Sequence, residues 1–120
     1  MSIKVMIVED DETWRTLFQL MLKSEKDMEI IGEFERAEVA LEHIPRLKPD
    51  VAIVDLSLPG MPGDEFAAEL KKYPAIKVII VTAYDEEYVT GLGLEGCAVV
   101  NKTYSEELVK KIRELCGGLG

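Results

Sequence analysis

The sequence predicts an α/β domain in which five parallel strands form a doubly wound sheet with helices on both faces. Two observations predict this class. Short apolar segments alternate along the 120 residues with segments in which apolar residues recur every three or four positions. The middle apolar segments, residues 51–54 and 77–82, are rich in β-branched residues and lack polar alternation, which is typical of strands buried on both faces. Alternating strand and helix units imply parallel strands with right-handed crossovers, here in one domain over residues 1–120.

The first half of the chain supplies two strand–helix units, with strands expected over residues 3–8 and 28–34. Asp11 is the expected N-cap of the first helix, because its carboxylate can accept a backbone hydrogen bond. The apolar residues that mark this helix are Trp14, Leu17, Phe18, Met21 and Leu22. The second helix repeats apolar residues at Ala37, Ala40, Leu41 and Ile44. Pro45 should end or kink it in its last turn.

The third strand, residues 51–54, ends at Asp55 and is followed by a loop rich in proline and glycine. Asp64 is the expected cap of the third helix. The residues of that helix expected to point inward are Phe66, Ala67 and Leu70.

The last two strands are expected over residues 77–82 and 97–101. The helix between them, over residues 86–94, should be short or labile, because each of its two glycines costs about 1 kcal/mol relative to alanine. Ser105 is the expected cap of the last helix. Its expected core residues are Leu108, Ile112 and Leu115. The glycine-rich residues 117–120 are either a true terminus or the start of a linker.

The composition argues against several kinds of partner. The formal net charge is −9 and the pI about 4.6, so binding to nucleic acid or to an anionic membrane would begin from repulsion. No apolar run is long enough to span a bilayer, and the N-terminus lacks signal-peptide structure, so we expect a cytoplasmic location. Cys97 and Cys116 form no CxxC pair, which argues against a zinc site.

Charged and polar residues stand where the strands end. Glu9 and Asp10 follow the first strand, Asp55 ends the third, and Thr82 and Lys102 end the fourth and follow the fifth. In an open α/β sheet these carboxyl ends share one edge, where ligands bind. Three carboxylates in one crevice repel each other unless protons or a cation neutralise them, and hard oxygen ligands suit Mg²⁺.

A lysine and a hydroxyl beside such a cation could receive anionic oxygens, so the set predicts a site for a phosphoryl group. A carboxylate in line with a phosphoryl donor can itself be the nucleophile. Each residue alone has an ordinary alternative. Asp10 could cap a helix, Thr82 could be a plain strand residue, and Lys102 could be a solvated surface lysine. Their shared position at the strand ends favours the site.

These residues resemble the receiver domain of bacterial two-component response regulators. The resemblance spans essentially the whole chain and rests on residues 7–11 (IVEDD), 54–60 (VDLSLPG), 80–83 (IVTA) and Lys102. Each piece is weak alone, and all four in order at strand ends are highly specific. The resemblance implies the flavodoxin-like (βα)5 fold.

It also implies roles for individual residues. Asp55 would accept a phosphoryl group from a sensor histidine kinase or a phosphotransfer protein, and Thr82 and Lys102 would hold the phosphoryl oxygens. The residues implied to hold Mg²⁺ are Asp10 directly, Glu9 through water, Ser57 through its backbone carbonyl, and Asp55.

The function implied is a phospho-accepting signalling switch, not an enzyme beyond self-catalysed phosphoryl transfer and slow autodephosphorylation. Its downstream partner would be a protein or output domain, and the family's fourth helix, fifth strand and fifth helix form a face through which it could also form a homodimer. The main alternative is a pseudo-receiver, a protein-interaction module that works without phosphorylation.

Two other classes fit less well. A phosphatase of the haloacid-dehalogenase type needs a second aspartate two residues after the first, where this chain has Ser57. A flavodoxin-like electron carrier would place its phosphate where the acidic residues 9–11 repel it.

Two positions depart from the family pattern. Val99 replaces an aromatic residue that normally reorients with the threonine, and valine is small and stiff at χ1. Thr103 replaces the proline that usually follows the lysine, so we expect either a trans Lys102–Thr103 bond with a reshaped turn or a strained cis bond. We therefore expect intact phosphorylation chemistry beside an atypical signalling face.

Overall fold

The structure, a computed structural model, describes residues 2–85, 89, 91, 92, 94 and 96–117. Its strands form one five-stranded parallel sheet of order β2-β1-β3-β4-β5. The strands are β1 (Ile3–Val8), β2 (Met28–Phe34), β3 (Val51–Asp55), β4 (Lys77–Thr82) and β5 (Ala98–Asn101). This order confirms the predicted doubly wound, flavodoxin-like sheet.

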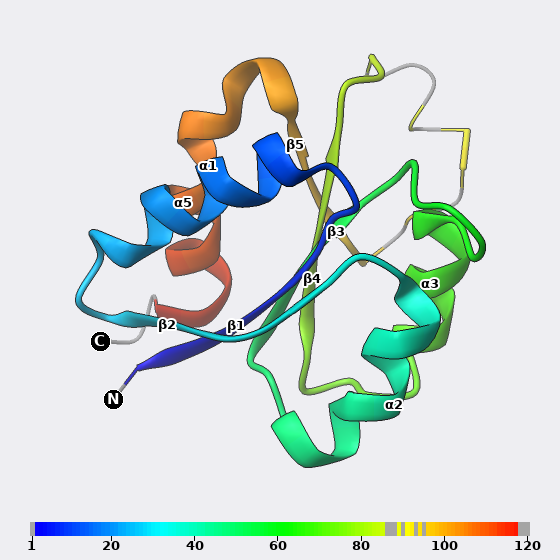
Figure 1. Cartoon of the computed structure of the whole chain (residues 1–120), viewed down its shortest axis with the longest axis horizontal. Helices are drawn as coiled ribbons and strands as arrows, with labels where there is room; N and C mark the ends of the chain where they lie inside the picture. Colours follow the sequence, from blue (N-terminus) through cyan, green and yellow to red (C-terminus); the bar gives the residue numbers. More distant parts are fainter. Residues whose placement is uncertain (1, 86–88, 90, 93, 95, 118–120) are drawn as a thin grey trace.

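Helices cover both faces of the sheet, as Figure 1 shows. One face carries α1 (Glu12–Lys23) and α5 (Leu108–Ile112), and the other carries α2 (Ala37–Leu47) and α3 (Gly63–Leu70). A 3-10 segment, η1 (Lys102–Glu107), precedes α5, and a π-helical turn, η2 (Arg113–Gly117), follows it. The helix predicted over residues 86–94 falls mostly on positions outside the described residues.

The hydrophobic core has two layers, one on each side of the sheet. Alternate residues of β3 supply both: Ala52 and Val54 pack with α2 and α3, whereas Val51 and Ile53 pack with α1 and α5. All five residues of β3 are buried. The β-branched run was therefore a correct sign of a strand covered on both faces.

Several local predictions are confirmed. Asp11 caps α1, with its Oδ1 accepting a hydrogen bond from the Trp14 backbone amide at 3.1 Å. Phe18 and Leu22 are buried on the inner face of α1, although Leu17 lies at the rim and is 37% exposed. Pro45 lies in the last turn of α2, which ends two residues later.

Two predicted caps are wrong. The N-cap of α3 is Pro62, without a side-chain hydrogen bond, and Asp64 lies inside the first turn. Ser105 does not cap the last α-helix, because it lies inside η1, just after a kink at Tyr104, and the N-cap of α5 is Glu107, without a side-chain hydrogen bond. The Asn101 side chain accepts a hydrogen bond from the Thr103 backbone amide and caps the start of η1. The Lys102–Thr103 bond is trans, which is the first of the two predicted outcomes.

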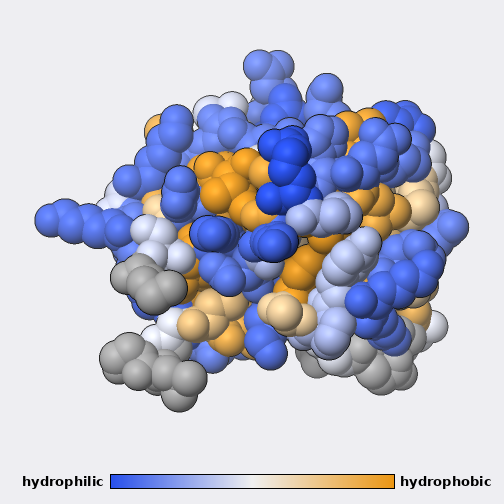
Figure 2. All heavy atoms as spheres, turned by 90° about the horizontal axis from the view of Figure 1, so that it is seen from below, coloured by the Kyte–Doolittle hydropathy of each residue, from blue (hydrophilic) through white to orange (hydrophobic). Residues whose placement is uncertain are grey.

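The two ends of the sheet differ in character. At the amino-terminal edge a cavity of about 350 Å³ is lined by Ser2, Ile3, Asp50, Ala75, Lys77, Leu115 and Cys116. Figure 2, which shows the molecule from below, has apolar residues on the surface between hydrophilic ones. The acidic residues singled out above lie at the opposite, carboxyl-terminal edge. No helix of the described residues is both long and apolar enough to cross a bilayer.

Candidate phosphoryl site

An acidic cluster forms where β1 and β3 end. Each of Glu9, Asp10 and Asp55 offers a carboxylate oxygen, and these oxygens lie within 4.8 Å of one another. Glu9 and Asp55 are buried, whereas Asp10 is exposed. The parallel pairing of β1 with β3 brings the two strand ends together, as the sequence predicted.

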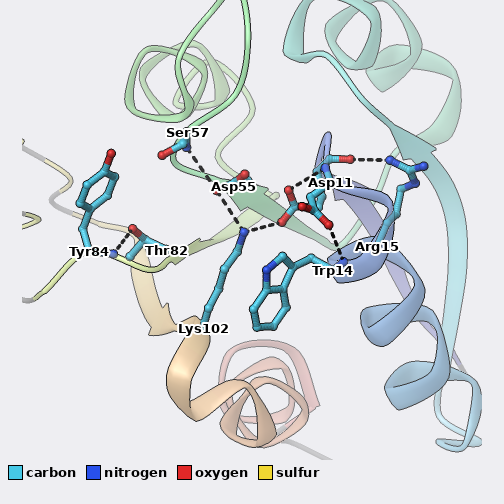
Figure 3. A network of polar contacts seen from close by, with 9 residues as sticks. Asp11, Trp14, Arg15, Asp55, Ser57, Thr82, Tyr84 and Lys102 are labelled. Atoms are coloured by element: carbon cyan, nitrogen blue, oxygen red, sulfur yellow. Dashed lines mark hydrogen bonds and ion pairs between the residues drawn. The ribbon is translucent and has the colours of Figure 1, made fainter.

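Lys102 is the first residue of η1, and its side chain points into this cluster (Figure 3). Its Nζ lies 2.9 Å from Glu9 Oε1 and 3.6 Å from Asp55 Oδ1, and its side chain is only 10% exposed. Lys102 and Glu9 therefore form an ion pair inside the cluster. One ammonium thus faces several carboxylates and compensates their charge only in part.

Burial, more than charge, sets the protonation of Glu9. Burial, a hydrogen bond shared with Asp55 and the charge of Asp55 raise the pKa of Glu9 to about 7, although Lys102 and the Asp11 amide act in the opposite direction. The Asp11 backbone amide donates to Glu9 Oε2 at 3.1 Å. Near neutral pH Glu9 therefore keeps a proton more readily than an ordinary carboxyl does, unless a cation takes the place of that proton.

Asp55 is held by the loop that follows it. The Ser57 backbone amide donates to Asp55 Oδ1 at 3.2 Å. Gly63 folds back against the same backbone and donates its own amide to the Leu56 carbonyl at 3.0 Å. A Cβ at position 63 would lie 2.3 Å from the Asp55 carbonyl oxygen, so this approach requires glycine.

Thr82 ends β4 and is almost fully buried. Its Oγ1 accepts a hydrogen bond from the Tyr84 backbone amide at 3.0 Å (Figure 3). The following Ala83 and Tyr84 are exposed. The buried Thr82 hydroxyl is thus followed directly by two exposed residues.

Two residues of α1 belong to the site although the sequence did not single them out for it. The Lys102 ammonium lies 5.0 Å from the centre of the Trp14 ring, within range of a cation–π contact. The Arg15 guanidinium donates from Nη1 to the Glu9 backbone carbonyl at 2.9 Å. Helical periodicity predicted only that Trp14 faces inward. Which strand end it meets depends on how α1 packs, and a single sequence does not give that.

The donor set fits a hard divalent cation. Carboxylate oxygens of Glu9, Asp10 and Asp55 lie within 4.8 Å of one another, and the only positive group that the described residues bring to Glu9 Oε1 is the Lys102 ammonium. Mg²⁺ binds through one or two carboxylates, keeps several waters, and prefers oxygen to the other ligand types.

Comparisons with known proteins agree on one family. The sequence model described as "Response regulator receiver domain" matches residues 5–113. The chain is 33% identical over 120 residues to the response regulator GacA of Pseudomonas aeruginosa. The matched region covers 97% of this chain and 56% of GacA. The chain spans about half the length of the first curated relatives it matches.

Solved structures give the same answer. The signal receiver domain of NarL from Mycobacterium tuberculosis superposes with a TM-score of 0.86 at 26% identity, covering 98% of both chains. The response regulator domain of CheB from Thermotoga maritima gives 0.85 at 25% identity, also covering 98% of both. The fold, the acidic edge of the sheet and these matches together show that the chain belongs to the receiver domain family of two-component response regulators.

Proposed function

We propose that the protein is a signalling switch in which Asp55 accepts a phosphoryl group from a sensor histidine kinase or a phosphotransfer protein. The observation that carries this proposal is the position of Asp55. It is buried at a strand end, 3.6 Å from an ammonium and within 4.8 Å of two further carboxylates. Such an arrangement suits a nucleophile whose product is a doubly charged phosphoryl group.

The transfer involves one bond made and one broken. An Asp55 carboxylate oxygen attacks the phosphorus of a phosphohistidine, the P–N bond breaks, and the imidazole leaves with the electron pair of that bond. Lys102 donates to a phosphoryl oxygen from its ammonium. The Thr82 hydroxyl can donate to another while its oxygen keeps the Tyr84 amide, because a hydroxyl both donates and accepts.

The residues that would hold Mg²⁺ are Asp10 and Asp55 directly, Glu9 through water, and Ser57 through its carbonyl. The ion would neutralise the carboxylates so that an anionic donor can approach. The chain's own part is to keep Asp55 oriented through the Ser57 amide and to hold Lys102 against Glu9 until a phosphoryl group arrives. Beyond this self-catalysed transfer and slow hydrolysis of the acyl phosphate, we propose no enzymatic activity.

The signal would be read by a protein. In and around β5, the residues Tyr84, Val99 and Tyr104 are 47%, 39% and 57% exposed, and such exposed apolar side chains suit a protein contact or a homodimer around β5 and α5 better than a nucleic acid. The net charge of −9 also disfavours binding to a nucleic acid, because both are negatively charged. We further propose that residues 1–120 form a single cytoplasmic receiver domain, with residues 117–120 at a terminus or the start of a linker.

A phosphoryl mimic tests the site without a kinase. Beryllofluoride with Mg²⁺ should bind the parent protein in a calorimetric titration with one site per chain, and Asp55→Asn should bind none. Binding that persists in Asp55→Asn would contradict the assignment of Asp55. No binding of either Mg²⁺ or beryllofluoride to the parent would favour the pseudo-receiver, which nothing in the geometry of the acidic cluster supports.

A further inference from the structure

Asn101 joins two loops at the edge of the site. It is the last residue of β5 and stands directly before Lys102. Its Nδ2 donates to the Tyr84 carbonyl at 3.0 Å, and its Oδ1 accepts from the Thr103 amide at 2.8 Å. The first bond reaches the loop after β4, and the second closes the first turn of η1. An aliphatic side chain at this position could make neither.

The link continues to Thr82. The Tyr84 amide donates to Thr82 Oγ1 at 3.0 Å, and the carbonyl of the same residue accepts from Asn101. Three consecutive hydrogen bonds therefore run from the buried Thr82 hydroxyl to the backbone at Thr103. Thr82 and Lys102, the two residues proposed to hold phosphoryl oxygens, are joined through Asn101 outside the acidic cluster.

Neither family departure could replace this link. Val99, on the same strand, has no polar side-chain atom and is stiff at χ1. Thr103 takes part because it keeps a backbone N–H, which a proline at this position would lack. The turn thus depends on the Asn101 side chain and on the backbone N–H of Thr103. The next residue, Tyr104, is 57% exposed.

We propose that Asn101 is a positioning residue that couples the Thr82 loop to the turn carrying Lys102. When the Thr82 hydroxyl shifts, the Tyr84 backbone shifts with it, and Asn101 transmits the displacement to Thr103 and the surface of η1. The coupling is a property of the unphosphorylated chain. Its use in signalling rests on the proposed function.

A double-mutant cycle on the unphosphorylated chain tests the coupling. Asn101→Asp keeps the acceptor for the Thr103 amide but loses the donor to Tyr84, and Thr82→Val removes the hydroxyl at nearly constant volume. We would measure hydrogen exchange of the Thr103 amide by NMR in the parent, both single variants and the double variant. Asn101→Leu, which loses both bonds, should exchange about fivefold faster and calibrates the assay.

Thr82→Val should accelerate Thr103 exchange about twofold or more in the parent and leave it unchanged in the Asn101→Asp background. Equal effects in both backgrounds, or none in the parent, would overturn the coupling. Amides of β1 serve as the internal reference for a general loss of stability, because residues 5–8 are fully buried.

Phosphorylation provides the second arm. With a small phosphodonor and Mg²⁺, hydrogen exchange of the Thr103 amide should change in the parent. The same treatment should leave this exchange unchanged in Asn101→Asp, although intact mass shows that the variant still gains a phosphoryl group. An equal response in both proteins would overturn the role of Asn101. If the parent takes up no phosphoryl group, the proposed function fails, and the exchange cycle alone still decides whether Asn101 couples the two loops.

Discussion

Glu9 is a buried carboxyl of the site whose burial raises its pKa. Its pKa of about 7 in the folded chain lies above the ordinary value of 4.5, so the folded state binds the proton more tightly than the unfolded state does. The resulting stabilisation is complete below pH 4.5 and is lost as the pH rises through about 7. In EDTA, the free energy of unfolding should therefore fall between pH 5 and 7.5, by at most about 3 kcal/mol.

Glu9→Gln is the matched control, because the amide resembles the protonated carboxyl and does not titrate. Urea denaturation of both proteins at the two pH values measures the difference. The other resolved carboxyl shifts, at Asp27, Glu38 and Glu114, lower the pKa and act below this pH window. A constant difference in stability between parent and variant across the window would show that Glu9 is already ionised.

Trp14 offers a second test at the residue scale. It is the single tryptophan of the chain, and its ring lies 5.0 Å from the Lys102 ammonium. Mg²⁺ should change its fluorescence saturably, because a cation on the carboxylates alters the ion pairs that hold Lys102 beside the ring. Asp10→Asn should shift the response to higher Mg²⁺ concentration. An identical response to Na⁺ at equal ionic strength would mean that the signal is not from the site.

The β3–α3 connection is the element on which the geometry of Asp55 depends. Gly63→Ala would place a methyl group 2.3 Å from the Asp55 carbonyl oxygen and 2.7 Å from the Leu56 Cα, where backbone must move. We expect a loss of about 1–3 kcal/mol in unfolding free energy, the usual cost of overpacking, together with weaker Mg²⁺ binding.

Gly117→Ala is the control for this substitution, because the nearest atom to its new Cβ would be Ile3 Cδ1 at an ordinary 3.4 Å. Its stability should stay close to that of the parent by urea denaturation. If Gly63→Ala were as stable as Gly117→Ala, the close approach behind Asp55 would not exist in solution.

Elements differed in how well the sequence predicted them. The strands β3 and β4 were predictable because burial on both faces leaves an unbroken β-branched run in the sequence. The meeting of Glu9, Asp55 and Lys102 at one edge was predictable because all three stand at strand ends. The helix starts at Asp64 and Ser105 were wrong, since any short polar residue can cap a helix and the choice depends on tertiary contacts. In the second case α5 begins after Glu107, and the capping side chain nearby is that of Asn101, whose bond to Thr103 starts η1 and is not revealed by any periodicity.

At the scale of the whole molecule, Mg²⁺ should stabilise the fold. The chain carries a net charge of −9, and among the described residues the Lys102 ammonium is the one that lies against its acidic cluster. A ligand that binds only the native state adds about 2.7 kcal/mol at a concentration one hundred times its dissociation constant. Thermal denaturation should therefore shift upward with MgCl₂ in the parent and much less in Asp10→Asn. Equal shifts would indicate general screening of surface charge.

The most direct test of the switch is the intact mass of the protein after incubation with a small phosphodonor and Mg²⁺, beside Asp55→Asn and a sample in EDTA. The account predicts one labile phosphoryl group on the parent, lost on treatment with hydroxylamine, and none on either control. A parent that binds Mg²⁺ yet gains no phosphoryl group, or an Asp55→Asn variant that gains one, would contradict Asp55 as the phosphoacceptor.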